Sequence, residues 1–174
     1  MYIRKWISVF VVIVAVVITQ SCQTKQNEMT ELNKQMLANE AFEIVSKVFE
    51  YSNNFDFESG LNHYSADVAS FYVSDGVPHR LDDLKKAYKQ AGAMVEVLEN
   101  TINKWDAQVL SEDLISFTLQ VSLQLKFKGL KEYTGNIVWT GLLQKQGNDW
   151  VIIQSHESWQ NCAEMASVLS TKEE

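Results

Sequence analysis

The chain contains little proline, glycine, cysteine or histidine. Its 174 residues include one proline, seven glycines, two cysteines and three histidines, while 46% of the residues are hydrophobic. This composition argues against a repeat or low-complexity protein and predicts an ordered globular domain. None of the histidines stands at metal-ligand spacing from another histidine or cysteine, so we expect no metal site, and nothing in the sequence calls for a cofactor.

Positive charge is also scarce. The chain has 15 lysines and arginines against 22 aspartates and glutamates, which gives a formal net charge of −7. Such a charge disfavours binding to nucleic-acid phosphates and to anionic lipid surfaces. We therefore expect no nucleic-acid partner, and any attachment to a membrane should depend on something other than charge.

The N-terminus carries a hydrophobic run that is short for a membrane span. Arg4 and Lys5 precede the apolar residues 6–18, and small or polar residues then lead to Cys22. A helix that spans a bilayer needs roughly 20 apolar residues. A removable secretion signal over residues 1–21 is therefore favoured, with an uncleaved anchor as the alternative.

The position of Cys22 resembles a bacterial lipoprotein signal, in which this cysteine is lipidated and becomes the mature N-terminus. Residues 22–33 would then form the lipidated N-terminus and a polar tether. Without Arg4 and Lys5 the formal charge changes from −7 to −9. The resemblance implies a protein anchored in the cell envelope by the lipid on Cys22, and Gln23 after the cysteine is similar to signals for the outer rather than the inner membrane.

With Cys22 lipidated, Cys162 has no partner within the chain, so we expect no structural disulfide and a partly buried thiol.

Helical periodicity dominates the first half of the remaining chain. From Thr30 the apolar residues recur at spacings of three and four, which predicts one long helix, or two joined near Ala38, ending at residues 52–54. Asp56 is placed to cap a short second helix. After Pro78 a third helix is expected, with an apolar stripe that continues to Leu98.

The second half alternates with a period of two. Apolar and polar residues alternate strictly from Ile115 to Phe127, which indicates a strand with one buried face. Further strands are expected at residues 68–73, 102–110, 133–145 and 150–159. Helices followed by an antiparallel meander predict the α+β class.

The last two predicted strands carry a resemblance to a known family. They form a hairpin that enters its turn from Trp139 and leaves through Trp150, aliphatic residues and a His156-Glu157-Ser158 ending. Together with residues 63–76 and the helix order, this hairpin resembles the SnoaL-like (polyketide-cyclase-like) group of the nuclear-transport-factor-2-like superfamily. The resemblance implies a cone over residues 34–162, in which N-terminal helices pack on a strongly bent antiparallel sheet, and a C-terminal tail over residues 163–174.

The resemblance also places a pocket between the concave sheet face and the helices. Ketosteroid-isomerase-like relatives carry an aspartate base where this chain has Tyr72, so that chemistry is disfavoured. His156 is the remaining catalytic candidate, on a face that we expect it to share with Trp150 and Ile152. The predicted pocket residues are Tyr72, Tyr88, Trp105, Trp139 and His156.

Three functional hypotheses follow. The first is a lipid-anchored envelope protein that binds a small, partly apolar ligand or serves as an interaction module, without catalysis. The second is a pocket enzyme, an isomerase, cyclase or lyase, with His156 as general base and Tyr72 or Tyr88 as donor. The third is a homodimer that acts as a scaffold for another envelope protein, which is favoured if the pocket is filled by its own side chains. In each case the resemblance implies a homodimer.

Overall fold

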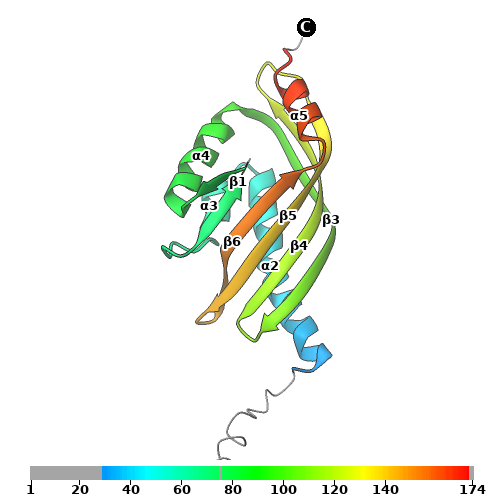
Figure 1. The fold of residues 1–174 in the computed structure, drawn as a ribbon. Coiled ribbons are helices and arrows are strands. Elements are labelled where there is room, and N and C mark those ends of the chain that lie inside the picture. Colours follow the sequence, from blue (N-terminus) through cyan, green and yellow to red (C-terminus); the bar gives the residue numbers. More distant parts are fainter. Residues whose placement is uncertain (1–28, 75, 173–174) are drawn as a thin grey trace, which may run out of the picture. The chain divides into compact units, whose positions relative to one another are not determined.

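A computed structural model describes residues 29–74 and 76–172 of the chain (Figure 1). The predicted lipoprotein signal and its lipidated Cys22 lie outside the described residues. The fold is built by the unit that begins at Glu31. Within the described residues, no helix is both long enough and apolar enough to span a membrane.

The described residues form four helices. The first is a single continuous helix, so the alternative of two helices joined near Ala38 is wrong. Its end at Asn53 agrees with the predicted stop, and the Asp56 carboxylate caps the next helix by accepting a hydrogen bond from Ser59 N at 3.2 Å. The helices are α2 (Glu31–Asn53), α3 (Phe57–Leu61), α4 (Leu81–Met94) and α5 (Cys162–Leu169).

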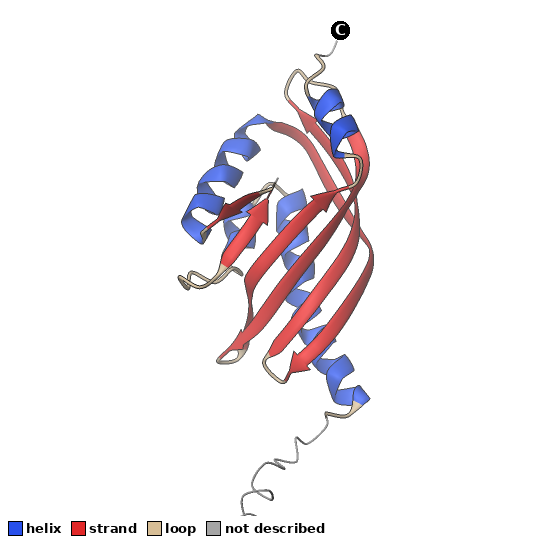
Figure 2. Cartoon of the chain, viewed as in Figure 1, coloured by secondary structure: helices blue, strands red, loops and turns tan. Residues whose placement is uncertain are grey.

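Six described strands form one mixed sheet in the order β2-β1-β6-β5-β4-β3 (Figure 2). All neighbouring strands are antiparallel except β1 and β6, which run parallel. The sheet is strongly curved and unclosed, and with the preceding helices it makes the predicted α+β cone. The strands are β1 (Phe71–Ser74), β2 (Val77–His79), β3 (Val95–Ser111), β4 (Leu114–Phe127), β5 (Tyr133–Gln146) and β6 (Asp149–Trp159).

Breaks in strand register accompany the curvature of the sheet. The β3–β4 ladder shifts register three times along its length. Between β5 and β6, Leu142 pairs with Gln154 but Leu143 pairs with Ile152, so Ile153 is an extra residue. Such bulges bend a strand and increase its twist. The long strands therefore curve around α2, which lies along one face of the sheet (Figure 1).

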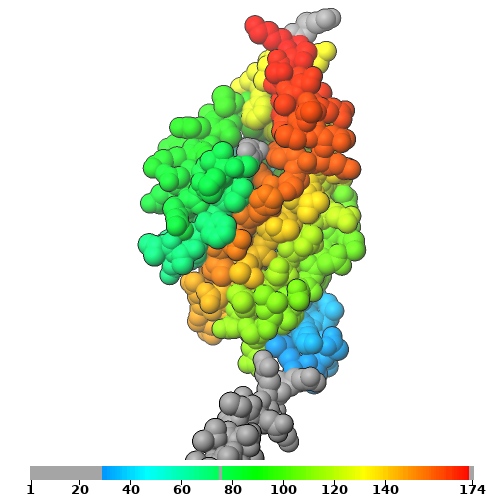
Figure 3. Space-filling model, in the orientation of Figure 1, coloured from blue at the N-terminus to red at the C-terminus, as the bar shows by residue number. Residues whose placement is uncertain are grey.

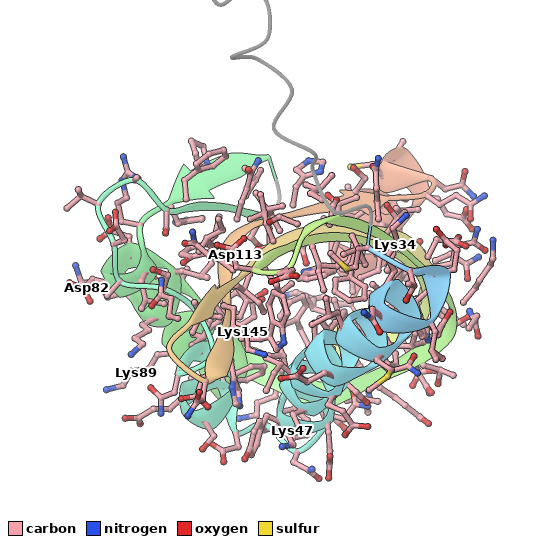
Figure 4. All side chains as sticks on the ribbon, turned by 90° about the horizontal axis from the view of Figure 1, so that it is seen from below. Lys34, Lys47, Asp82, Lys89, Asp113 and Lys145 are labelled. Atoms are coloured by element: carbon pink, nitrogen blue, oxygen red, sulfur yellow. The ribbon has the colours of Figure 1, made fainter. Side chains whose placement is uncertain are left out.

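The core lies between α2 and the inner face of the sheet. The alternating residues of β4 supply its centre, with Ile115, Phe117 and Leu119 almost fully buried. Opposite them α2 presents Ala41 and Val45, whose small side chains let the helix approach the strands. Burial of a side chain the size of leucine or phenylalanine contributes about 1.5–3 kcal/mol. Beside Ala41, Glu40 of α2 lies near Lys145 of β5, whose Nζ is 3.1 Å from Glu40 Oε1; Figure 4 labels Lys145.

Three predicted element boundaries are wrong. The third helix was expected to reach Leu98 and the next strand to start at residue 102, but α4 ends at Met94 and β3 already starts at Val95. Val95 and Leu98 are still turned inward, because a strand can continue the burial that the helix begins. The first strand starts at Phe71 rather than at residue 68, and Val68 is exposed.

The C-terminal segment also differs from the expectation. The residues assigned to a tail include most of α5, which follows β6 closely and contributes Leu169 to the edge of the core. Cys162, at the start of α5, is exposed, so the expectation of a partly buried thiol is wrong. A left-handed Asn161 turns the chain from β6 into this helix.

Candidate functional site

A cavity of about 400 Å³ opens between the inner sheet face and the helices α2, α3 and α4. Its walls come from residues far apart in the sequence, because α4 covers one side of the curved sheet while β4, β5 and β6 form the other. Most of the lining is aliphatic or aromatic. The polar side chains in the lining are Ser52, Tyr64, Ser74, His79, Tyr88, Asn100 and Glu157.

Glu157 is the acid of this cavity. It is half-buried on β6, and the Ser74 hydroxyl, at the end of β1, donates a hydrogen bond to its Oε1 at 2.8 Å. The parallel pairing of β1 with β6 brings these two side chains together from 83 residues apart in the chain. In the ladder between β5 and β6, Glu157 pairs with Trp139 of β5. The carboxylate therefore lies on the inner face, beside an indole ring.

Tyr64 lies on the wall of the cavity near Glu157. Burial raises the pKa of its hydroxyl far above the usual range, and the nearby negative charge of Glu157 acts in the same direction. The side chains of Ser155 and Trp139 lie near this hydroxyl and partly offset the rise. Tyr64 thus stays neutral.

Asn100 joins the cavity wall to the end of α2. The Asn53 side chain accepts a hydrogen bond from Asn100 N at 2.7 Å and donates one to Asn100 O at 2.9 Å. An amide side chain thereby pairs with the backbone of β3 as a neighbouring strand would. This clamp holds the last turn of α2 against the strand that carries Asn100 into the lining.

His156 does not lie in the cavity. The predicted shared face with Trp150 and Ile152 is wrong, because the extra residue Ile153 reverses the alternation of β6. Trp150 and Ile152 point inward before the bulge, and Ser155, Glu157 and Trp159 point inward after it. His156 is exposed on the outer face, opposite Thr140 of β5. The space-filling view shows this outer face of β4, β5 and β6 at the surface (Figure 3).

Tyr72 serves the core rather than the cavity. It is 1% exposed, and its hydroxyl lies 2.6 Å from Ser65 O and 3.1 Å from Ile152 O. Burial raises the pKa of this hydroxyl. Because its one hydrogen is directed at backbone carbonyls, Tyr72 ties the loop before β1 to β6 and is not placed to act as a donor to a ligand.

Only some of the five predicted pocket residues therefore line the cavity. Tyr88 and Trp139 line the cavity, whereas Tyr72, Trp105 and His156 do not. Trp105 stacks on Phe42 of α2, with ring centroids 4.4 Å apart, in another part of the core.

Sequence reasoning missed Glu157, Ser74 and Tyr64. One signal could have found Glu157: counting the alternation backwards from Trp159 places Glu157 inward. The forward count from Trp150 excluded it.

The described residues contain no group of three or more histidines, cysteines, aspartates or glutamates that could hold a metal ion. The cavity offers instead a hydrogen-bonded carboxylate, several hydroxyls and the imidazole of His79, all set in an apolar wall. Such a lining can bind a small molecule through its apolar surface and orient it through few polar contacts.

Comparison with known proteins matches residues 43–161 to a family described as the SnoaL-like domain. A search of curated proteins found no match.

Several solved structures share the fold. A protein described as NTF-2 like and of unknown function, from Shewanella oneidensis MR-1, has a TM-score of 0.56 at 22% identity, covering 70% of this chain and 98% of that one. A hexachlorocyclohexane dehydrochlorinase from Novosphingobium barchaimii LL02 has a TM-score of 0.66 at 8% identity, covering 75% and 91%. A candidate scytalone dehydratase from Novosphingobium aromaticivorans DSM 12444 has a TM-score of 0.68 at 7% identity, covering 75% and 89%. At these identities the likeness shows the fold.

Proposed function

Because this chain belongs to the SnoaL-like domain family and encloses an apolar cavity in its cone, we propose that it binds a small, largely apolar molecule there. The observation that carries the proposal is the cavity itself. Its volume of about 400 Å³ falls in the range of small-molecule sites, and its apolar walls surround a few polar groups. A scaffold whose pocket is filled by its own side chains is therefore disfavoured.

The family supports the same conclusion. Its members bind ligands or act as dehydratases and isomerases, and the dehydrochlorinase with the same fold is named for a small apolar substrate. The fold alone does not select among these activities. The composition of the cavity wall is what favours ligand binding in this chain.

A fluorescent probe and a cavity-filling variant test the proposal. N-phenyl-1-naphthylamine is an uncharged dye that brightens in apolar sites, and we expect saturable 1:1 binding. Ala91 on α4 lines the cavity, so Ala91→Trp should weaken this binding about tenfold or more by occupying its space. The control is Ala93→Trp, on the same helix but exposed and outside the lining. Absence of saturable binding, or equal binding by Ala91→Trp, contradicts the proposal.

Catalysis in the same cavity is the second candidate function. The outward position of His156 removes the base that the sequence suggested, while Glu157 provides a carboxylate in an apolar wall, where acid–base groups of enzymes are often found. Native mass spectrometry of protein purified from its own host can identify a retained ligand. Conversion of that ligand by the protein, abolished in Glu157→Gln, distinguishes an enzyme from a binding protein.

We also propose that the protein is anchored in the cell envelope, preferentially in the outer membrane, by a lipid on Cys22. The support is the order of charged residues, apolar run and cysteine at the N-terminus. The Cys22→Ser protein should leave the membrane fraction. If it remains there, the apolar run is an uncleaved anchor.

Homodimerisation through the outer sheet face remains our expectation for the family. The same native mass spectra give the subunit count, and a monomer at micromolar concentration contradicts it.

A further inference from the structure

The aromatic and charged groups of the cavity wall are unevenly distributed. Glu157 is the only acidic residue in the lining, and the lining contains no lysine or arginine. All of these lining residues belong to the described part of the chain. The surroundings of the carboxylate therefore indicate which ligand charge the cavity accepts.

Aromatic rings flank Glu157 on the inner face. Trp139 is its direct partner across the β5–β6 ladder, and side chains of such a pair lie about 4.5–5.5 Å apart at Cβ. Trp159 is two residues further along β6 and lines the same cavity. Tyr64 is close enough for the charge of Glu157 to raise its pKa. The carboxylate therefore shares the inner face of the sheet with two tryptophans and a tyrosine.

The aromatic groups are also fixed in position. Phe49 of α2 packs edge-on against Trp139, with ring centroids 6.0 Å apart, and Tyr64 packs edge-on against Tyr72, with ring centroids 4.9 Å apart. Ser74 holds the carboxylate from the other side. A ligand that enters this end meets groups that are already oriented, which reduces the entropy lost on binding.

Three kinds of ligand can be compared at this end of the cavity. An anionic group would stand beside Glu157 with no lysine or arginine in the wall to offset the repulsion. A wholly apolar ligand would cover the carboxylate and remove water from it, which carries a desolvation penalty. A cationic group gains both from the carboxylate and from the negative faces of the rings. The net charge of −7 attracts cations to the protein as well.

We propose that the ligand of this cavity is an organic cation, with its ammonium group against Glu157 and its apolar body along the aromatic and aliphatic wall. This inference rests on the proposed binding function. It adds the charge of the ligand and names Glu157 as the residue that recognises this charge.

Three probes of similar shape test the charge preference. Protonated 4-phenylbutylamine, neutral 4-phenylbutan-1-ol and anionic 4-phenylbutanoate differ mainly in charge, and each is titrated against bound N-phenyl-1-naphthylamine. We expect the amine to compete about tenfold better than the alcohol, and the carboxylate to compete worst. In Glu157→Gln, which keeps the shape and can still accept from Ser74, the amine should lose this advantage while the alcohol is unaffected.

The control is Glu99→Gln, which removes the same charge from an exposed position on β3 outside the lining. It should keep the preference for the amine, since the effect depends on the local carboxylate rather than on net charge. Equal competition by the three probes, or a preference for the amine that survives in Glu157→Gln, overturns the inference and leaves the binding function in place. If the dye itself does not bind, the proposed function fails and the inference fails with it.

Discussion

The Ser74 hydroxyl donates a hydrogen bond of 2.8 Å to the Glu157 carboxylate, and this bond links the end of β1 to the inner face of β6 inside the cavity. No local sequence pattern around either residue predicts this contact. The bond forms because β1 pairs in parallel with β6 and because the bulge at Ile153 reverses which side chains of β6 face inward, so that Glu157 does.

Loss of this bond should weaken the recognition of an amine. In Ser74→Ala the carboxylate keeps its charge but loses the donor that orients it, so the affinity for 4-phenylbutylamine should fall about threefold to tenfold. The affinity for 4-phenylbutan-1-ol should be unchanged. Competition with the dye measures both. Ser158→Ala, at an exposed position on β6 next to Glu157, is the matched control. An equal loss for amine and alcohol indicates a damaged cavity rather than a lost orientation.

His156 should be dispensable for binding. Its side chain is exposed on the outer sheet face, so His156→Ala should change the free energy of unfolding by less than about 0.5 kcal/mol and leave the dye affinity as it is. Urea unfolding and dye titration test these two expectations. A tenfold loss of dye affinity in this variant would falsify the outward placement of the imidazole.

Tyr72→Phe should affect stability without affecting the cavity. The variant removes a buried hydroxyl that lies within hydrogen-bond distance of Ser65 O and Ile152 O, so we expect a loss of about 1–2 kcal/mol in urea unfolding. Tyr133→Phe is the comparison, because its hydroxyl makes one longer bond of 3.2 Å to Gln160 O, and its loss should be smaller. Weaker dye binding by Tyr72→Phe at unchanged stability argues for a role at the ligand instead.

The clamp between Asn53 and Asn100 should stabilise the end of α2. Asn53→Ala breaks two hydrogen bonds to the backbone of β3 and should cost about 1–3 kcal/mol. Asn54→Ala removes one exposed bond within the helix, to Glu50 O, and should cost less than about 1 kcal/mol. Urea unfolding of the two variants side by side gives the difference. Equal losses mean that the clamp adds nothing to an ordinary helix end.

Acidification should destabilise the fold partly through His63. Burial, and then the positive charge of Lys47, lower the pKa of His63 below its ordinary 6.5. Below about pH 6.5 the unfolded chain therefore takes up this proton before the folded chain does, and the free energy of unfolding falls. From about pH 7.5 to 5.5 the native protein should lose stability more steeply than His63→Gln.

Lys47→Gln sharpens this prediction, because removing the nearby cation allows His63 to bind its proton at higher pH in the folded state. The slope should then lie between those of the native protein and His63→Gln. Parallel curves for all three proteins contradict the assignment of this pH dependence to His63.

Local sequence signals predicted most of the elements for physical reasons that act over a few residues. The strict alternation from Ile115 to Phe127 is β4, because one face of that strand is buried throughout. Asp56 caps α3 because its carboxylate accepts a hydrogen bond from the backbone N–H only three residues later, which does not depend on the rest of the fold. The third helix was extended too far because Val95 and Leu98 are buried in β3, and burial at these spacings also fits a helix.

The site was predicted less well than the fold, because its membership depends on single residues. A strand that gains one residue turns its next side chains to the opposite face. The extra Ile153 moved His156 to the surface and Glu157 into the cavity. Trp105 shows a second reason: its aromatic ring was as suitable for a pocket as Trp139, and only the packing of Phe42 against it assigns it to another part of the core.

Sequence alone determined the class of fold, the order of helices and strands and the acidic character of the chain, since these follow from composition and local periodicity. It also determines the charged and apolar N-terminal pattern on which the proposed lipid anchor rests. Only the tertiary structure decided which side chains face the cavity. That choice depends on strand pairing and on the bulge in β6. The bulge costs one regular pair in the ladder, but it lets the sheet curve and pack more closely around α2.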